Sequence, residues 1–261
     1  MTAIKAQAVI LALGLPDGCR VDQRVPKKLL LENGAPTAAD KRLITDVIEE
    51  IQWVATLKPY TIGVPEYQDE QREYLEIVVL AVTLRGAVKP ASRSRLAELM
   101  HRAVPYPALL LLIEGQVLTL SLIHKRWAQN ETNKVVLEDS LVSVSLSDAT
   151  AGTCSETERA FMQSLSITHQ PKVTLHALYQ GWMDCVQTLL AARLTGSYRT
   201  TATPEQAAAR RQALITCERL EAEIGRLRTQ ATKEKQLARQ VAVNLEIKAL
   251  LAEHQRIAHD L

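Results

Sequence analysis

The most regular hydrophobic pattern in the chain lies between Thr37 and Pro59. Thr37 followed by Asp40 is a variant capping box, which predicts the start of a helix. After it, apolar residues recur every three or four positions, as they do on one face of a helix; they are Leu43, Ile44, Val47, Ile48, Ile51, Val54 and Leu57. Because proline breaks a helix interior, the pattern predicts one long amphipathic helix that ends before Pro59.

Residues 59–103 predict extended chain followed by a short helix. The segment "PYTIGV" (59–64) predicts a short strand, and residues 66–73 an acidic loop. The segment "YLEIVVLAVTL" (74–84) is rich in β-branched residues and almost wholly apolar, which is the pattern of a strand buried on both faces. Residues 92–103 then predict a short helix with its leucines inward and its arginines outward.

The next stretch predicts a β-hairpin. Pro105 and Pro107 exclude a helix there, so "ALLLLIE" follows them as extended chain. Glu114-Gly115-Gln116 is a tight reversal. The returning segment alternates between two faces: Val117, Thr119, Ser121 and Ile123 on one, Leu118, Leu120 and Leu122 on the other. "NKVVLEDSLVSVSL" (133–146) predicts one or two further strands.

The order of these elements predicts an α/β (α+β) domain, with a mixed β-sheet and flanking helices, over residues 1–147. The apolar run at the N-terminus adds a first packed helix. Residues 148–202 are predicted to be a helical segment and linker. One apolar stripe of that segment comprises Leu175, Leu178, Trp182, Cys185 and Leu189.

Residues 203–261 predict a coiled-coil-like C-terminal region. Thr203 as N-cap, Pro204 after it and Gln206 three places on form a strong start signal. Two blocks of heptad-like spacing follow, separated by polar residues, so the region is either one long helix with a stutter or a helical hairpin. A narrow seam needs a partner to cover it, either another protein or a second copy, unless it packs on the chain's own domain. The predicted partner-binding residues are Leu220, Ile224, Leu227, Val243, Ile247, Leu250 and Ile257.

Composition narrows the classes of function. The net charge of +2 gives no global case for nucleic-acid binding, and 4% aromatic residues argue against a platform that stacks single-stranded bases. The four cysteines lie far apart without a CxxC pair, which is typical of reduced thiols. No stretch approaches the roughly 20 apolar residues of a membrane span, and the N-terminal run is a poor export signal. We expect a cytoplasmic protein with no metal ion, cofactor or membrane partner.

Familiar catalytic motifs are absent from the sequence: it has no P-loop, dinucleotide fingerprint, zinc-protease helix or nucleophile elbow. The enzymatic alternative is a divergent PD-(D/E)xK-type nuclease, in which Glu50, an acid of residues 66–73 and Glu76 would hold Mg²⁺. The lysine expected two places after the acid is missing, so Lys89 or Lys125 would have to replace it. The sequence therefore assigns no catalytic residue and leaves enzymatic activity open.

Basic residues between positions 85 and 126 form a candidate nucleic-acid surface. Five cations and one acid lie between Arg85 and Arg102, and two more cations end the hairpin. If the short helix lies beside the exit of the hairpin, these charges share one surface that contacts phosphates without reading bases. Ordinary solvated surface is the alternative. The predicted nucleic-acid-binding residues are Arg85, Lys89, Arg93, Arg95, Lys125 and Arg126.

Five blocks in order carry a family resemblance: "KKLLLENG", "DKRLITDVIEEIQWVATLKPYTI", "LEIVVLAVTL", "VPYPALLLLIEG" and "KEKQLARQVAVNLEIKALL". Over nearly the whole chain they resemble an uncharacterised bacterial domain family encoded beside helicases and DNA methyltransferases in restriction and phage-defence loci. The resemblance implies a helper protein and no particular reaction. The residues that carry it are Lys27, Lys28, Asp40, Lys41, Trp53, Pro59, Glu76, Pro105, Tyr106, Pro107 and Lys125.

We therefore expect a non-catalytic accessory subunit of a DNA-targeting restriction or phage-defence system. Its C-terminal helix would bind a partner protein, which the resemblance implies is the helicase or methyltransferase of the same operon, or would form a homo-oligomer. Its basic surface would steady the DNA backbone. A sensor or toxin-control component is a third possibility that the sequence does not separate from the first.

Overall fold

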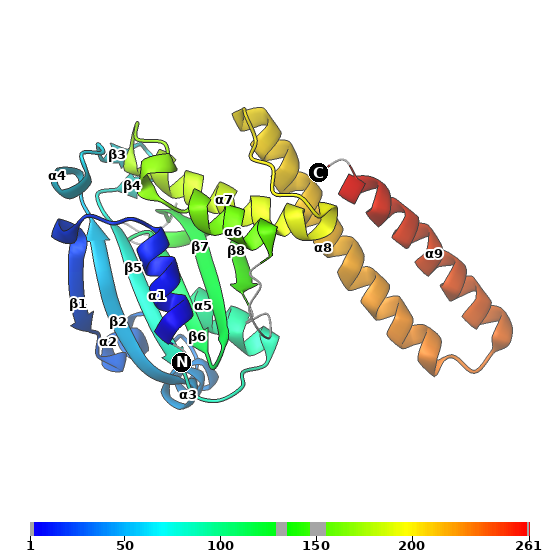
Figure 1. The fold of residues 1–261 in the computed structure, drawn as a ribbon. Coiled ribbons are helices and arrows are strands. Elements are labelled where there is room, and N and C mark those ends of the chain that lie inside the picture. The colour runs from blue at the N-terminus through cyan, green and yellow to red at the C-terminus, as the bar shows by residue number, and fades with distance from the viewer. Residues whose placement is uncertain (1–2, 129–134, 147–154, 260) are drawn as a thin grey trace. The chain divides into compact units, whose positions relative to one another are not determined.

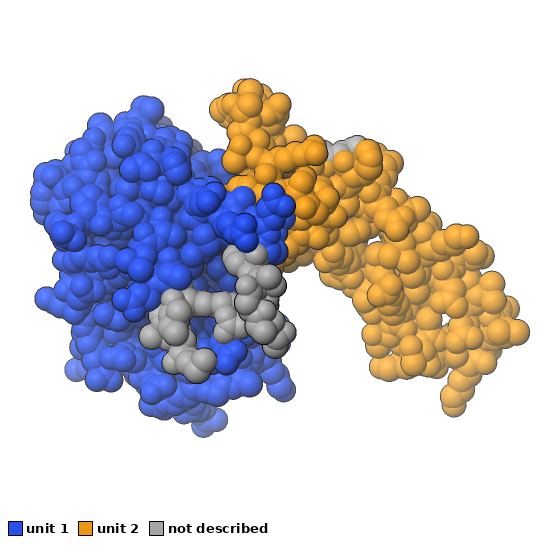
Figure 2. Space-filling model, in the orientation of Figure 1, with its two compact units in different colours: residues 1–186 blue, residues 187–261 orange. Residues whose placement is uncertain are grey.

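The computed structural model of the chain describes residues 3–128, 135–146, 155–259 and 261. The chain divides into two compact units, residues 1–186 and residues 187–261 (Figure 2). The division falls inside helix α7 (Leu175–Thr195). The domain boundary expected at residue 147 lies outside the described residues, and the one expected at residue 203 lies within the second unit.

A six-stranded mixed sheet forms the centre of the first unit (Figure 1). Its order is β1-β2-β5-β6-β7-β8, and every neighbouring pair is antiparallel except β5 and β6. Parallel neighbours need a crossover, and helix α5 (Pro90–Ala103) supplies it. The predicted mixed α/β architecture is confirmed. The strands are β1 (Arg20–Arg24), β2 (Ile48–Leu57), β5 (Ile77–Leu84), β6 (Ala108–Glu114), β7 (Val117–Trp127) and β8 (Val135–Leu146).

Helices cover both faces of this sheet (Figure 1). Helices α2 (Lys27–Asn33), α3 (Ala38–Val47) and α5 share one hydrophobic core with alternate residues of β5, namely Val78, Leu80, Val82 and Leu84. The intervening residues Ile77, Val79 and Ala81 are equally buried. They point to the opposite face, where α1 (Ala3–Ala12), α6 (Glu156–Ser164) and the first part of α7 lie. The prediction of a strand buried on both faces is confirmed.

The long helix predicted up to Pro59 is wrong in its second half. Helix α3 ends at Val47, and residues 48–57 form strand β2. The register of β2 against β5 shifts twice, between Ile48 and Glu50 and between Trp53 and Ala55. A β-bulge inserts one extra residue and lengthens the local side-chain period. As a result the buried residues of β2 recur at a spacing of three, which imitates a helical face.

The short strand predicted over residues 59–64 is also wrong, whereas the acidic loop predicted over residues 66–73 is confirmed for residues 69–72. Residues Pro59–Ile62 form the short helix α4, where proline occupies the favoured first position and the Thr61 hydroxyl accepts the Lys58 N–H at 2.9 Å. The acidic segment is a hairpin of β3 (Tyr67–Gln68) and β4 (Glu73–Tyr74). The hairpin predicted from β6 and β7 is confirmed, and β8 is a single strand. Short 3₁₀ turns follow α1 and α6, at Asp17–Cys19 and Ile167–His169.

The second unit contains a helical hairpin, which was one of the two expected forms of the tail. Helix α8 (Pro204–Lys233) begins at Thr203, whose hydroxyl accepts the Gln206 N–H, as the start signal predicted. The chain reverses after Lys233, and α9 (Leu237–His259) packs back on α8. Ile224, Leu227 and Ala231 of α8 form a buried cluster with Ile247. No helix among the described residues is long and apolar enough to span a membrane.

A substitution at Gly34 tests the packing of α2 on α5. A Cβ atom at this position would lie 2.6 Å from the Ala103 Cβ and 2.8 Å from the Leu99 carbonyl oxygen. We expect Gly34→Ala to lower the free energy of unfolding by about 1–3 kcal/mol, because overpacking forces the helices apart. Urea denaturation measures the loss. Gly18→Ala is the control, since nothing lies within 4 Å of its new methyl group. Equal stability of the two variants would contradict this packing.

Candidate functional site

Strand β7 carries ionisable side chains to both faces of the sheet. Paired residues of neighbouring strands point to the same face, and Leu110 of β6, which belongs to the core under α5, pairs with Ser121. Ser121 and Lys125 therefore face α5, whereas His124 faces α7. All three side chains are buried. Buried polar groups need partners, so β7 organises a polar network on each side of the sheet.

On the α7 side, five aromatic rings, that of His124 included, form one cluster. Its imidazole stacks on that of His176, with ring centroids 5.0 Å apart and an interplanar angle of 21°. Tyr74 meets His176 edge-on at 4.9 Å, and Tyr67 contacts His176 at the same distance. Tyr179 closes the group from α7, 5.5 Å from His124. The cluster joins the β3–β4 hairpin, strand β7 and helix α7.

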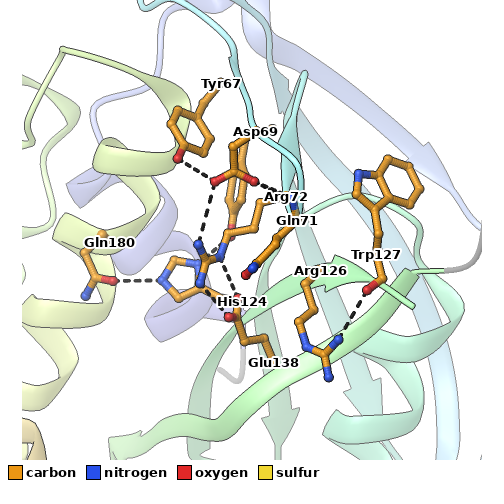
Figure 3. A network of polar contacts seen from close by, with 10 residues as sticks. Tyr67, Asp69, Gln71, Arg72, His124, Arg126, Trp127, Glu138 and Gln180 are labelled. Atoms are coloured by element: carbon orange, nitrogen blue, oxygen red, sulfur yellow. Dashed lines mark hydrogen bonds and ion pairs between the residues drawn. The ribbon is translucent and has the colours of Figure 1, made fainter. Parts of the chain in front are cut away.

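Hydrogen bonds fix the tautomer of His124 (Figure 3). The Gln180 amide nitrogen is engaged with Asp184, so its oxygen faces His124 Nε2, and the Tyr74 hydroxyl donates to the bare Nδ1. His124 Nε2 then carries the ring proton and donates to Gln180 Oε1 at 2.8 Å. The Gln180 amide in turn donates to Asp184 at 2.8 Å. A continuous chain of polar side chains therefore runs from Tyr74 of β4 through His124 to α7.

Charged groups form the rim of the cluster (Figure 3). Arg72 makes a bidentate ion pair with Glu138 of β8, through Nε at 2.7 Å and Nη2 at 2.5 Å, and this contact lowers the pKa of Glu138. Asp69 accepts the Tyr67 hydroxyl at 2.7 Å and the backbone N–H groups of Gln71 and Arg72, and these bonds lower its pKa. The rim carboxylates are thus stabilised as anions by partners within the protein.

His176 differs from His124 in its hydrogen bonding. Neither of its ring nitrogens makes a hydrogen bond among the described residues, and burial, together with the charge of Arg72, lowers its pKa to about 4. The ring is therefore neutral at physiological pH. No group of three potential metal ligands occurs in the described part of the chain. The geometry suits a polar lock between elements better than a reaction centre.

The predicted nucleic-acid surface is not one surface. Arg85 follows the end of β5, and the register places that end beside the end of β6 and the start of β7. Arg126 lies at the other end of β7, so it is separated from Arg85 by the length of the sheet. The end of α5 does lie beside the exit of the hairpin, where Lys125 Nζ donates to the Val104 carbonyl, but the six predicted cations do not share one surface.

A phosphate-binding surface needs exposed cations without partners, and most of the predicted cations are paired or partly buried. Arg93 pairs with Glu114 at 2.5 Å, and Arg95 pairs with Asp40 at 2.9 Å and with Glu98. The Arg95 contact lowers the pKa of Asp40 to about 2. Arg126 is half-buried and donates to the Trp127 carbonyl. Of the six predicted residues, Arg85 and Lys89 are the exposed ones.

Lys125 is the clearest correction, because it is a core residue. Its side chain is only 3% exposed, and its Nζ donates to the Val104 and Tyr106 carbonyl oxygens. Burial lowers its pKa to about 7. Nearby, His101 bonds Ser121 at 3.0 Å, and burial and the charge of Lys125 lower the pKa of His101 to about 3. Lys125 therefore does not reach a phosphate on the surface.

The acids proposed for a nuclease have separate partners. Glu50 lies on β2 with its carboxylate 3.5 Å from Arg24, and Glu76 pairs with Lys58 at 3.1 Å. Within residues 66–73, Asp69 bonds Tyr67 and neighbouring amides. The helix that was to present Glu50 does not exist at this position. The described residues therefore do not assemble the expected Mg²⁺ site.

The predicted partner-binding residues line the inside of the helical hairpin. Ile224, Leu227 and Ile247 are buried in one cluster, with Val243 and Leu250 packed against it. Leu220 is also buried, and Ile257 is half-buried. The premise of an uncovered seam is wrong, because each half of the tail covers the other. That these residues bind a partner stays a prediction, and it would require the hairpin to open.

Sequence reasoning missed the other side of α9. Leu237, Val241 and Leu245 are 75%, 50% and 63% exposed. They follow one another at a spacing of four, and exposed alanines extend the same face; these are Ala238, Ala242, Ala249 and Ala252. The steps from 238 to 252 are four, three, four and three, which is a second heptad pattern. The stronger inner pattern of branched residues obscured it.

Comparison with known families gives one match. The model of the family described as "Domain of unknown function (DUF4391)" matches residues 13–253. No curated protein and no solved structure matches the chain. The match covers both the sheet and most of the helical hairpin.

Removing the Tyr74 hydroxyl tests the lock around His124. We expect Tyr74→Phe to lower the free energy of unfolding by about 1–3 kcal/mol, because His124 Nδ1 would lose its buried partner. Urea denaturation measures the change. Tyr60→Phe is the matched control, since Tyr60 is 82% exposed. If both variants unfold at the wild-type midpoint, the hydrogen-bonded chain does not stabilise the fold.

The lowered pKa of His176 predicts that the stability of the folded protein depends on pH. The folded state keeps its ring neutral down to about pH 4, whereas the free side chain binds a proton near 6.5. Between these values the unfolded chain binds more protons, so the free energy of unfolding falls as the pH falls. We expect His176→Phe to remove part of this slope, on the order of 1 kcal/mol between pH 7 and pH 5.

Denaturation midpoints at pH 7, 6 and 5 test the role of His176. His169→Gln, at an exposed position, should keep the full slope. An unchanged slope in His176→Phe would show that another group carries the dependence.

Proposed function

We propose a function for this chain from the premise that it belongs to the family described as "Domain of unknown function (DUF4391)". The protein is a non-catalytic accessory subunit that binds a partner protein along the outer face of helix α9. The observation that carries the proposal is the exposed apolar stripe of Leu237, Val241 and Leu245. The alanines named above complete this stripe, which we call the outer stripe.

The outer stripe is separate from the seam that holds the hairpin together. At about 100° per residue, Leu245 and Ile247 point in nearly opposite directions from the axis of α9. Ile247 is buried against α8, so the hairpin does not need Leu245 for its own packing. An exposed row of large apolar side chains is uncommon on a surface without a partner and marks an interaction site.

The chemistry of the outer stripe fits a helix. Its four-three spacing is that of a helix–helix seam, and its small alanine side chains allow a close approach of the two axes. Glu246 and Glu253 flank it on one edge, and Lys248 lies within it, between the directions of Leu237 and Val241. We therefore propose that the partner supplies an amphipathic helix with a matching apolar stripe and opposite flanking charges.

The identity of the partner rests on the family resemblance described above. It implies a helicase or a DNA methyltransferase encoded beside this protein in a restriction or phage-defence locus. Of the six residues predicted to bind nucleic acid, Arg85 and Lys89 are the ones whose side chains are exposed. Two neighbouring cations neutralise too few phosphates for binding at physiological salt, so the proposal rests on protein binding. The pairing of Glu50 with Arg24 and of Glu76 with Lys58 supports a non-catalytic role.

The test is co-expression with the neighbouring helicase and methyltransferase, followed by affinity purification. We expect Leu245→Glu to weaken the complex at least about tenfold, which is 1.4 kcal/mol, because the carboxylate would lie in an apolar contact. Ala222→Glu adds the same charge at an exposed position of α8, outside the outer stripe, and should bind like the wild type. Circular dichroism checks that both variants keep their helix content.

Light scattering of the isolated protein tests self-association, in which a second copy of the chain would cover the outer stripe. A dimer that Leu245→Glu dissociates would identify a second copy as the partner. Binding of the Leu245→Glu variant with wild-type affinity, to either neighbour and to itself, would contradict the proposal.

A further inference from the structure

Lys125 is buried without a counter-charge. It lies on the α5 side of β7 with 3% of its side chain exposed. Its Nζ donates to the carbonyl oxygen of Val104 and, at 2.6 Å, to that of Tyr106. Both carbonyls belong to the connection between α5 and β6. No carboxylate pairs with this nitrogen among the described residues, which is unusual for a buried amine.

The number of available acceptors matches the neutral form of the amine. An ammonium group has three N–H donors, and two acceptors are present in the described structure. A neutral amine has two N–H donors, which the Val104 and Tyr106 carbonyls accept, and one lone pair. Burial lowers the pKa of Lys125 to about 7, so near neutral pH a large fraction of the molecules carries this nucleophilic form.

A cavity of about 170 Å³ lies beside this lysine. It has the volume of roughly five or six water molecules in the liquid, which suits an organic compound of a few heavy atoms. Lys125, Tyr106 and Trp127 are among its lining residues, with the charged side chains of Arg126 and Glu73. All of them belong to the first unit.

We propose that this cavity is a binding site for a small 2-oxo acid, and that Lys125 forms an imine with its carbonyl group. The amine nitrogen attacks the carbonyl carbon, and the carbonyl oxygen takes up a proton, which gives a carbinolamine. Loss of the hydroxyl group as water then leaves a C=N bond, and both amine protons have moved to oxygen. The condensation needs no oxidant or reductant. Arg126 supplies a cation for the carboxylate of the compound.

The imine couples the site to the chain around Tyr106. The imine nitrogen then takes up one proton from the solvent, and this protonated imine has a single N–H, so Lys125 can serve only one of the two carbonyl groups that it serves in the free protein. The connection between α5 and β6 therefore loses one buried hydrogen bond when the site is occupied. This inference is independent of partner binding by α9, which lies in the second unit.

Reductive trapping tests the site in the intact wild-type protein. Glyoxylate with cyanoborohydride at pH 7 should convert the imine to a stable carboxymethyl group, which peptide mass spectrometry locates. Lys89, an exposed lysine outside the cavity, is the internal reference. We expect Lys125 to be modified at least about tenfold faster than Lys89, because burial lowers the pKa of Lys125 and leaves more of its amine unprotonated. In urea this preference should disappear.

Two further arms separate the chemistry from the fold. Lys125→Arg keeps a long hydrogen-bond donor and removes the nucleophile, so its other lysines should be labelled at wild-type rates. Acetaldehyde lacks the carboxylate, so it should mark Lys125 more slowly than glyoxylate relative to Lys89. Equal relative rates would overturn the assignment to 2-oxo acids. Labelling of Lys89 with no modification of Lys125 in the folded protein would show that Lys125 is a structural link only.

Discussion

The burial of polar side chains on both faces of β7 is the constraint on which the first unit depends. A strand at this position alternates between two covered faces, so His124 and Lys125 enter opposite cores. Each must find partners there, because a buried polar group without one is costly. His124 obtains them from Tyr74 and Gln180, and Lys125 from the carbonyls of Val104 and Tyr106. Elements distant in sequence are thereby fixed to one strand.

The second unit depends on apolar contacts rather than on buried polar groups. Helix α9 has two apolar faces, and the hairpin covers the one that contains Ile247. The other, with Leu245, stays exposed in the chain as described. The protein combines a sheet, in which the buried polar side chains of β7 have partners within the first unit, with a helical hairpin that still has apolar surface to bury. That combination favours a role in assembly over a role in chemistry at the ion-paired acids.

Sequence patterns predicted those elements whose periodicity reflects burial alone. Strand β5, the β6–β7 hairpin and the start of α8 belong to this group, because alternation, prolines and capping residues mark them locally. Strand β2 was predicted as helix, since two bulges give its buried residues a helical spacing. The burial of Lys125 has no local signal either. It depends on carbonyl groups about twenty residues away, and on a parallel strand pairing that no short pattern reveals.

Contacts between distant residues also decide the structure of the C-terminal region, and local sequence patterns do not reveal them. The inner seam was recognised correctly as apolar, but the chain reversal after Lys233 decides what covers it. The most direct test of the account is side-chain footprinting by hydroxyl radicals, on the protein alone and in complex with its co-expressed partner. The account predicts strong protection of Val241 and Leu245 in the complex and little change at Ile224 and Ile247. Protection of the latter two, with Leu245 still reactive, would contradict it.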